Sequence, residues 1–332
     1  MASNFDSGRR EAGSLVTVFG GSGFVGRHTV RALAKGGWSV RAAVRRPDLA
    51  GHLQPMGSVG QIQPVQANLR YPASVIRAIE GADAVVNLVA ILHKSGAQTF
   101  DALHVDGARA VARAAWKAGI KTFVHVSAIG ADAKSKGHYG RTKAAGEAAV
   151  LQEHPDAIIL RPSIVFGPED QFFNRFANLA RMSPVMPLVG GGRTRFQPVY
   201  VGDLASAIAN AVDGGAKPGV TYEIGGPEVF TFRQLLDKTQ TWAGRSKPNF
   251  PMPFWMAKLS AVLTVPLPNS WRPLTVDQVC MLQVDNVLSA TALKDGRTLA
   301  GLGITDLHTI QSIVPAYLER FQPKGQFSHY RG

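Results

Sequence analysis

Three side chains near the middle of the chain have the types and spacing that proton transfer to a carbonyl group requires. Tyr139 and Lys143 are four residues apart, so they share one face of a helix expected over 139–153. A nearby cation stabilises a phenolate and lowers the pKa of the phenol, so Tyr139 is a candidate proton donor or acceptor. Ser127 ends the strand expected before it, where its hydroxyl would point into the same cleft. The Tyr–Lys spacing alone is a weak signal, because it arises often by chance.

A glycine-rich turn upstream supplies the context for these side chains. An apolar β-branched run over 15–19 predicts a buried strand, and 24–35 has the pattern of a helix. Between them, Gly21 allows a tight turn, Gly23 allows close approach to a pyrophosphate, and Gly26 allows the helix to pack on the strand. The turn predicts a bound dinucleotide on the N–H groups at the helix start, and a glycine turn without a ligand is the alternative. The residues expected to bind it are Gly20, Gly21, Ser22, Gly23, Phe24, Val25 and Gly26.

Two arginines indicate which dinucleotide is bound. The next expected strand, 39–44, ends at Arg45 and Arg46, where an NAD-selective site usually has an acidic residue for the ribose 2′-hydroxyl. A guanidinium suits a 2′-phosphate, which a carboxylate would repel. The sequence therefore predicts NADP(H). The alternative is that both arginines are solvated loop residues.

The composition sets the class of protein. The 332 residues are 45% hydrophobic and 18% charged, as is ordinary for a soluble α/β protein. The one cysteine, Cys280, excludes an internal disulfide and fits a reducing compartment. Residues 1–14 lack the apolar core of a secretory signal, and the apolar segment 251–268 is interrupted by prolines and is too short to cross a bilayer. The net charge of +13 favours an acidic partner, an anionic membrane surface or nucleic acid without choosing between them.

Strand and helix patterns alternate along the first half of the chain. This alternation predicts an α/β fold, a doubly wound parallel sheet of the Rossmann type. We expect a flexible N-terminus over 1–14, an NADP-binding domain over 15–227 with parts of 167–198 contributing to the cleft, and a smaller, mostly helical C-terminal lobe over 228–332. The further expected elements are strands 61–66, 83–89, 121–126, 157–161 and 220–224 and helices 72–79, 106–118 and 139–153.

Together these motifs resemble the short-chain dehydrogenase/reductase superfamily in its extended or atypical branch, over about residues 15–230. In that family Ser, Tyr and Lys carry the redox chemistry, which implies Ser127, Tyr139 and Lys143 here. The resemblance extends to the segments that follow the third and fourth strands and to residues 160–168 and 198–204. It implies that the cofactor-binding residues also include Arg45, Arg46, Asn68, Leu69, Leu88, Val89, Ala90, Tyr139, Lys143 and Pro162.

One departure from the family pattern concerns the hydroxyl that polarises the carbonyl. Extended members commonly have consecutive hydroxyl residues at this strand end, whereas Ser127 is followed by Ala128. The alignment puts the catalytic position at Ala128, and a one-residue offset turns a strand side chain to the opposite face. The loss of an oxyanion donor lowers a rate by about 10²–10³. Turnover is therefore less well supported than cofactor binding.

The C-terminal lobe has a narrower resemblance. The runs Pro-Leu-Thr-Val-Asp-Gln-Val at 273–279 and Gln-Val-Asp-Asn-Val at 283–287 resemble the NADPH-carrying accessory subunits of respiratory complex I. This resemblance implies a tightly held NADPH, no established substrate turnover, partners among the other subunits, and docking on the peripheral arm near the membrane. The absence of an Arg- and Ser-rich transit peptide favours the cytoplasmic face of a bacterial inner membrane, while a processed mitochondrial chain would lie on the matrix side.

The surface patterns leave alternatives open. Arg109, Arg113 and Lys117 form a basic stripe, which is either a solvated face or a docking surface for an acidic subunit or anionic lipid. The run 254–263 is either an interfacial helix or part of the lobe's own packing. No metal-ligand spacing and no nucleic-acid platform is evident. Two other functions remain: an NADPH-dependent reductase or epimerase using Tyr139 and Lys143, and a regulator that senses the NADP(H) redox state.

Overall fold

The structure, a computed structural model, describes residues 13–263 and 274–323. Seven strands between residues 15 and 224 form a parallel sheet in the order β11-β6-β5-β4-β1-β2-β3. The order reverses between β1 and β4, so a crevice is expected beyond the carboxyl ends of these two strands. The strands are β1 (Leu15–Phe19), β2 (Ser39–Val44), β3 (Ile62–Gln66), β4 (Ala84–Asn87), β5 (Thr122–Val126), β6 (Ile158–Pro162) and β11 (Thr221–Ile224).

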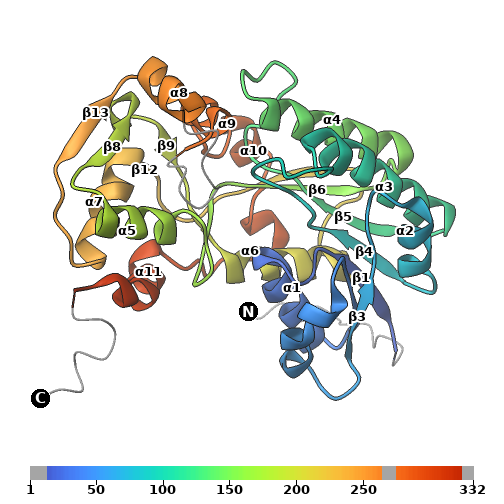
Figure 1. The fold of residues 1–332 in the computed structure, drawn as a ribbon. Coiled ribbons are helices and arrows are strands. Elements are labelled where there is room, and N and C mark those ends of the chain that lie inside the picture. The colour runs from blue at the N-terminus through green and yellow to red at the C-terminus, as the bar shows by residue number, and fades with distance from the viewer. Residues whose placement is uncertain (1–12, 264–273, 324–332) are drawn as a thin grey trace, which may run out of the picture.

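Helices cover both faces of the sheet, as Figure 1 shows. On one face α1 (Phe24–Lys35) packs on α6 (Val201–Asn210), and their buried apolar side chains share a core with the strands. On the other face α3 (Ala108–Lys117) packs on α2 (Pro72–Ile79) and on α4 (His138–Glu153) around a second core. The near-continuous apolar strands are buried because both faces are covered.

The C-terminal lobe has its own core of aromatic and aliphatic side chains, contributed largely by three helices. Two-stranded ladders join it to the chain after β6, as at β8 (Met186–Val189) and β13 (Asn249–Met252). The other ladders pair β7 (Val165–Phe166) with β10 (Val199–Tyr200) and β9 (Arg195–Phe196) with β12 (Phe230–Thr231). The helices are α5 (Phe173–Met182), α7 (Phe232–Trp242), α8 (Phe254–Leu263), α9 (Val276–Met281), α10 (Ala290–Lys294) and α11 (Ile310–Leu318).

The predicted fold class is confirmed, with two local differences. The strand expected over 83–89 ends at Asn87, because the chain leaves the sheet there and lines a cavity. The helix expected over 106–118 is preceded by a π-helical turn, Asp101–Gly107, that continues directly into α3. The expected flexible segment at the N-terminus lies almost wholly outside the described residues, as do Pro273 and the end of the expected lobe.

Candidate functional site

The turn between β1 and α1 leaves the N-terminus of the helix open. Gly20 has φ of 81°, in the left-handed region that favours glycine. α1 begins at Phe24 with Gly23 as its N-cap, and no side chain caps this end. The first N–H groups of a helix have no intrahelical acceptor and carry the positive end of its dipole. The end of α1 can therefore bind an anion.

The glycines of this turn differ in how much space a side chain would have at each position. A Cβ on Gly26 would lie 2.1 Å from the carbonyl oxygen of Gly20, so only glycine fits there. A Cβ on Gly21 would lie 3.0 Å from the Cβ of Ala42 on β2. A Cβ on Gly23 would meet only the Gly20 oxygen, at 3.3 Å, and would otherwise enter the cavity that Gly23 lines. The fold thus requires glycine at position 26 and leaves little space for a side chain at Gly21, and Gly23 keeps the cavity open.

A cavity of about 230 Å³ lies at this turn, beyond the ends of β1, β2 and β4. Its lining joins the glycine turn to segments more than 60 residues away, so the fold brings together most of the expected cofactor-binding residues. Those that line it are Gly20, Ser22, Gly23, Arg45, Asn68, Leu69, Leu88, Val89 and Ala90. The sequence did not point to Ala43, Val44, Ala67, Ile91, Gln98 or Leu103, which also line it. Of the other expected residues, Gly21, Phe24, Val25 and Gly26 shape the turn, and Arg46, Pro162, Tyr139 and Lys143 are not in its lining.

Tyr139 and Lys143 lie in the first two turns of α4, which begins at His138. Lys143 is 2% exposed, and its ammonium group donates to the carbonyl oxygen of Val126, 3.0 Å away at the end of β5. Tyr139 is 8% exposed, and its ring meets the ring of Phe100 edge to face at 6.0 Å. The Ser127 hydroxyl oxygen is buried without a hydrogen-bond partner within the described residues. Lys143 therefore reaches the end of β5 from the helix that also carries Tyr139.

The electrostatics of this pair differ from the expectation. Burial raises the pKa of Tyr139 to about 12, so the prediction that Lys143 lowers it is wrong. Burial also lowers the pKa of Lys143 to about 8, partly opposed by the Glu147 carboxylate. The physical reason is desolvation, which disfavours phenolate and ammonium alike. Near neutral pH the phenol holds its proton, and Lys143 is within about one pH unit of releasing one.

Comparison with protein-family models assigns most of this chain to one family. The model of the NAD dependent epimerase/dehydratase family matches residues 16–225, which contain the whole sheet, the glycine turn and α4. The chain belongs to this family. The expected resemblance to extended short-chain dehydrogenases is thereby confirmed, and the fold is that of an NAD-dependent family.

Several proteins similar to this chain are subunits of a respiratory enzyme. The chain is 37% identical over 293 residues to the mitochondrial NADH dehydrogenase [ubiquinone] 1 alpha subcomplex subunit 9 of Arabidopsis thaliana, covering 85% of this chain and 73% of the relative. The mouse protein of the same name is 35% identical over 255 residues, covering 75% and 67%. A ceramide reductase from Caulobacter vibrioides is 34% identical over 198 residues, covering 60% and 61%. The narrower resemblance read from the C-terminal lobe is confirmed.

Solved structures share the fold at low sequence identity. An NADPH-dependent quinone oxidoreductase from Escherichia coli, complexed with NADPH, superposes with a TM-score of 0.70 at 19% identity, covering 90% of this chain and 97% of its own. A UDP-glucose 4-epimerase from Thermus thermophilus, in complex with NAD, gives 0.66 at 22% identity, covering 92% and 98%. These likenesses support the family's architecture over nearly the whole chain.

Arg45 and Arg46, at the end of β2, have different surroundings. Arg45 lines the cavity. Arg46 points its guanidinium at Asp48, whose carboxylate accepts at 2.7 Å, and this pair lowers the pKa of Asp48. The structure therefore places Arg45 in the cavity lining and pairs the guanidinium group of Arg46 with a carboxylate.

The C-terminal lobe reaches the start of α4 through Asp277, a contact that the sequence did not reveal. Its Oδ1 accepts from the backbone N–H of His138 at 2.6 Å and of Tyr139 at 3.4 Å. This carboxylate caps the helix, because the N-cap residue Gly137 has no side chain to do so. Thr275 and Gln278 form a capping box that fixes α9, which carries Asp277.

Asn286 makes a second link between the lobe and the strand ends. Its Oδ1 accepts from the Ser163 hydroxyl at 2.6 Å and from the Ile164 N–H at 3.0 Å, and its Nδ2 donates to the Ile129 carbonyl at 3.2 Å. Ile129 and Ser163 follow β5 and β6. The two runs that resemble complex I subunits thus hold the lobe against the carboxyl edge of the sheet.

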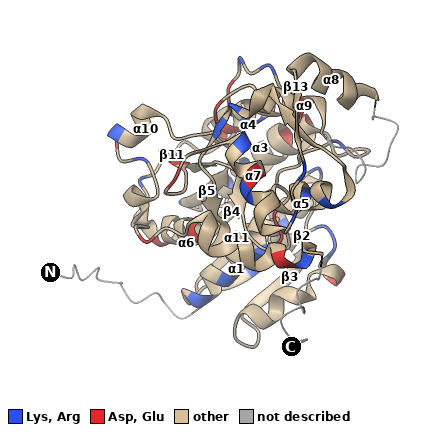
Figure 2. Ribbon diagram, turned by 90° about the vertical axis from the view of Figure 1, so that its left-hand side faces the viewer, with Lys and Arg blue, Asp and Glu red and all other residues tan. Residues whose placement is uncertain are grey.

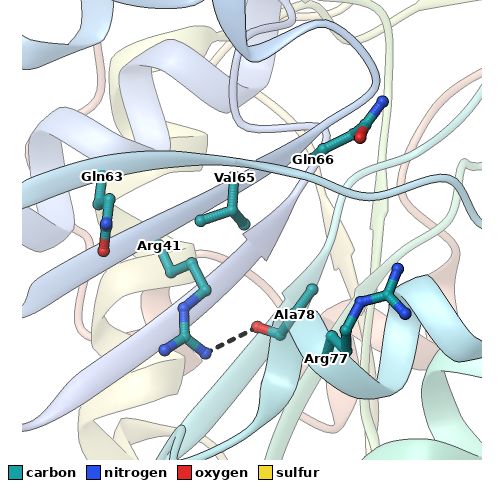
Figure 3. A pocket seen from close by; sticks show the side chains of 6 residues that line it. All are labelled: Arg41, Gln63, Val65, Gln66, Arg77 and Ala78. Carbon is teal, nitrogen blue, oxygen red and sulfur yellow. Dashed lines mark hydrogen bonds between the residues drawn. The ribbon is translucent and has the colours of Figure 1, made fainter.

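A second concavity, of about 300 Å³, lies beside the edge strand β3. Figure 3 shows the Arg41 side chain directed at Ala78, to whose carbonyl oxygen it donates at 2.9 Å. A second hydrogen bond joins Arg41 to the Glu80 carbonyl at 2.7 Å. Arg41 therefore connects β2 to the end of α2 and is engaged in holding the fold together.

The remaining observations concern the basic stripe, possible metal ligands and membrane-spanning helices. In the basic stripe, Arg109 pairs with Asp106 at 3.4 Å and Arg113 with Glu153 at 2.5 Å, which favours a solvated face. Within residues 13–263 and 274–323, no three His, Cys, Asp or Glu side chains gather as metal ligands would. Over the same residues no helix has the length and hydropathy needed to span a bilayer.

Proposed function

We propose that this chain is an NADP(H)-binding accessory subunit of respiratory complex I, in which the dinucleotide is mainly structural or regulatory. The observation that carries the proposal is the 37% identity over 293 residues to the Arabidopsis alpha subcomplex subunit 9. The Neurospora crassa 40 kDa subunit of NADH-ubiquinone oxidoreductase, 27% identical over 293 residues, supports it from a distant lineage. These relatives span both the nucleotide-binding half and the lobe.

The residues around the cavity fit a dinucleotide phosphate. The uncapped N-terminus of α1 supplies N–H donors for a pyrophosphate, and Gly23 leaves room for it. Arg45 provides the guanidinium for a 2′-phosphate, which favours NADP(H) over NAD(H). When bound, such a cofactor supplies a hydride donor or acceptor. A ligand that binds only the folded chain stabilises it by about 4 kcal/mol at 1,000 times its Kd, which is the structural role proposed here.

The proposed docking surface is the exposed face of α8. Trp255, Leu259 and Leu263 are 68%, 51% and 69% exposed, and the helix also carries Lys258. Figure 2 shows α8 at the periphery of the lobe, away from the sheet. Aromatic and aliphatic side chains beside a basic residue suit the boundary between a membrane and a peripheral subunit. We therefore place the chain on the peripheral arm near the membrane, against other subunits and an anionic lipid surface.

The location follows from that docking. In a bacterium the chain would lie on the cytoplasmic face of the inner membrane, and in a mitochondrion on the matrix side of the inner membrane. Its net charge of +13 supports attraction to an anionic lipid surface.

The test is to purify the tagged full-length chain from native membranes and resolve it on native gels stained for NADH dehydrogenase activity. Co-migration with the activity and release of NADP(H) on denaturation are the expected results. Leu259→Glu should reduce co-migration, whereas Leu293→Glu on α10, a leucine of similar exposure (59%), serves as the matched control. A chain found only free in the soluble fraction would overturn the proposal.

A soluble NADPH-dependent reductase or epimerase is the second candidate. It is favoured by the 34% identity to the Caulobacter ceramide reductase and by the presence of Tyr139 and Lys143 on one helix at the strand ends. In that case the Tyr139 phenol would protonate the substrate carbonyl oxygen and Lys143 would stabilise the phenolate. Tyr139→Phe should then abolish oxidation of NADPH by an added carbonyl substrate while leaving NADPH binding unchanged. An inert wild-type chain across ketones that include 3-oxo lipids would count against it.

A further inference from the structure

A buried histidine lies between the nucleotide cavity and the helix that carries Tyr139. His104 is 1% exposed and belongs to the π-helical turn Asp101–Gly107. Such turns are rare and recur at functional sites. The turn packs backbone to backbone on α4, since a Cβ on Gly146 would lie 2.1 Å from the His104 carbonyl oxygen.

The hydrogen bonds of the His104 ring have one consistent direction. The Ile91 backbone N–H can only donate, so the His104 Nε2, 3.1 Å away, accepts and is unprotonated. The proton of the neutral ring is then on Nδ1, which lies 3.1 Å from the Thr142 hydroxyl oxygen. That hydroxyl donates its own proton to the Tyr139 carbonyl oxygen at 3.0 Å, so it accepts from Nδ1. A continuous series of hydrogen bonds therefore runs from Ile91 through His104 and Thr142 to Tyr139.

This series of hydrogen bonds joins the nucleotide cavity at one end to the start of α4 at the other. Ile91 lines the cavity, as does Leu103 in the π-helical turn itself. Tyr139 lies at the start of α4, and its ring meets the His104 ring at 5.4 Å, perpendicular to it. Burial and the nearby Lys143 lower the pKa of His104 to about 3, so the ring stays neutral, as the hydrogen bond from the Ile91 N–H to Nε2 requires.

We propose that His104 is a positioning residue that couples the Leu88–Ile91 segment of the nucleotide cavity to the start of α4. The inference rests on the proposed function, since it takes NADP(H) as the occupant of the cavity. A buried N–H left without an acceptor is costly, so loss of the ring nitrogen would let the Ile91 segment move from its bound-state position. A substitution at His104 that removes this acceptor should therefore weaken NADPH binding.

The first test is spectroscopic and uses the full-length chain labelled with ¹⁵N-histidine. Long-range ¹H–¹⁵N correlation spectra should show His104 as the neutral tautomer with the proton on Nδ1. Thr142→Val, similar in shape but without the acceptor, should shift the Nδ1 signal while Nε2 still accepts. A proton on Nε2 in the wild-type chain would overturn the proposed chain of hydrogen bonds.

The second test measures NADPH affinity by fluorescence titration. His104→Phe fills the space without an acceptor and should raise the Kd about tenfold. His104→Gln should restore most of the affinity, because its Oε1 takes the place of Nε2. An unchanged Kd for His104→Phe, or failure of His104→Gln to restore a weakened one, would overturn the inference while leaving the proposed function intact. No NADPH binding by the wild-type chain would overturn both.

Discussion

Gly23→Ala separates nucleotide binding from folding, because the cavity and the fold make different demands on the glycine turn. Gly23 is exposed, with φ of −73° and ψ of 179°, which alanine adopts without strain. The new methyl group would meet only the Gly20 oxygen at 3.3 Å, so the free energy of unfolding should change by no more than about 0.5 kcal/mol. The methyl group would, however, stand where a pyrophosphate approaches the helix N-terminus.

The expected loss is that of a charge-assisted hydrogen bond, about 1.5–3 kcal/mol, or roughly 10- to 100-fold in Kd. At NADPH concentrations that stabilise the wild-type chain by about 4 kcal/mol, a 100-fold weaker variant would gain only about 1.4 kcal/mol. For a chain of this length the ligand-induced rise in Tm would fall from about 6 °C to about 2 °C.

Differential scanning fluorimetry with and without NADPH measures both quantities. Gly26→Ala is the matched control, because its Cβ would lie 2.1 Å from the Gly20 oxygen and should lower stability by at least about 1–3 kcal/mol even without ligand. If Gly23→Ala kept the full ligand-induced rise in Tm, or lost as much unliganded stability as Gly26→Ala, the assignment of the cavity would be refuted.

Three further predictions follow from single side chains. Arg45→Ala should weaken NADPH binding about tenfold and NADH binding hardly at all, whereas Arg46→Ala, whose guanidinium already pairs with a carboxylate, should change neither; calorimetric titration with both nucleotides decides. His104 has a folded-state pKa of about 3 against about 6.5 when unfolded, so the unfolded chain binds the extra proton and stability falls with pH below about 6.5. The free energy of unfolding, measured with urea between pH 6 and pH 4, should therefore depend on pH less steeply in His104→Gln, by about 1.4 kcal/mol per pH unit. An equal pH dependence in the two proteins would contradict the burial argument. Asp277→Ala removes the oxygen that caps α4, so it should cost about 1 kcal/mol and speed amide exchange at the start of α4; unchanged protection there would show that the cap is dispensable.

Elements with local signals were predictable from the sequence. β1, α1, β2 and α2 have the expected bounds, because apolar runs, glycines and a proline at the first helical position fix them locally. The two-residue strands after β6 had no such signal. Each exists only through its partner, as Val165–Phe166 does through Val199–Tyr200. Structure that depends on distant pairing is not encoded in a short window of sequence.

In the site, too, residues with a local sequence signal could be predicted, whereas residues that act through distant contacts could not. The glycine turn and the tyrosine–lysine pair were found because their spacing is the signal. Asp277 contacts a helix start 139 residues earlier, and His104 contacts Thr142 38 residues later, so neither spacing points to the other. The pKa of Tyr139 was mispredicted for a related reason. Spacing places a lysine near the phenol, but burial, a property of the whole fold, sets the larger effect.

Binding and turnover place different demands on this site, and the described residues meet the first more fully. The cavity has an open helix N-terminus, a turn in which Gly26 leaves no space for a side chain, and Arg45 in its lining. After β5 the chain has Ala128, which carries no hydroxyl, and burial raises the pKa of the Tyr139 phenol. The start of α4 is also fixed from the lobe by Asp277. These contacts fix the resting arrangement, which suits the proposed role of holding a dinucleotide. Turnover needs, in addition, donors that interact more strongly with a developing oxyanion than with the ground state.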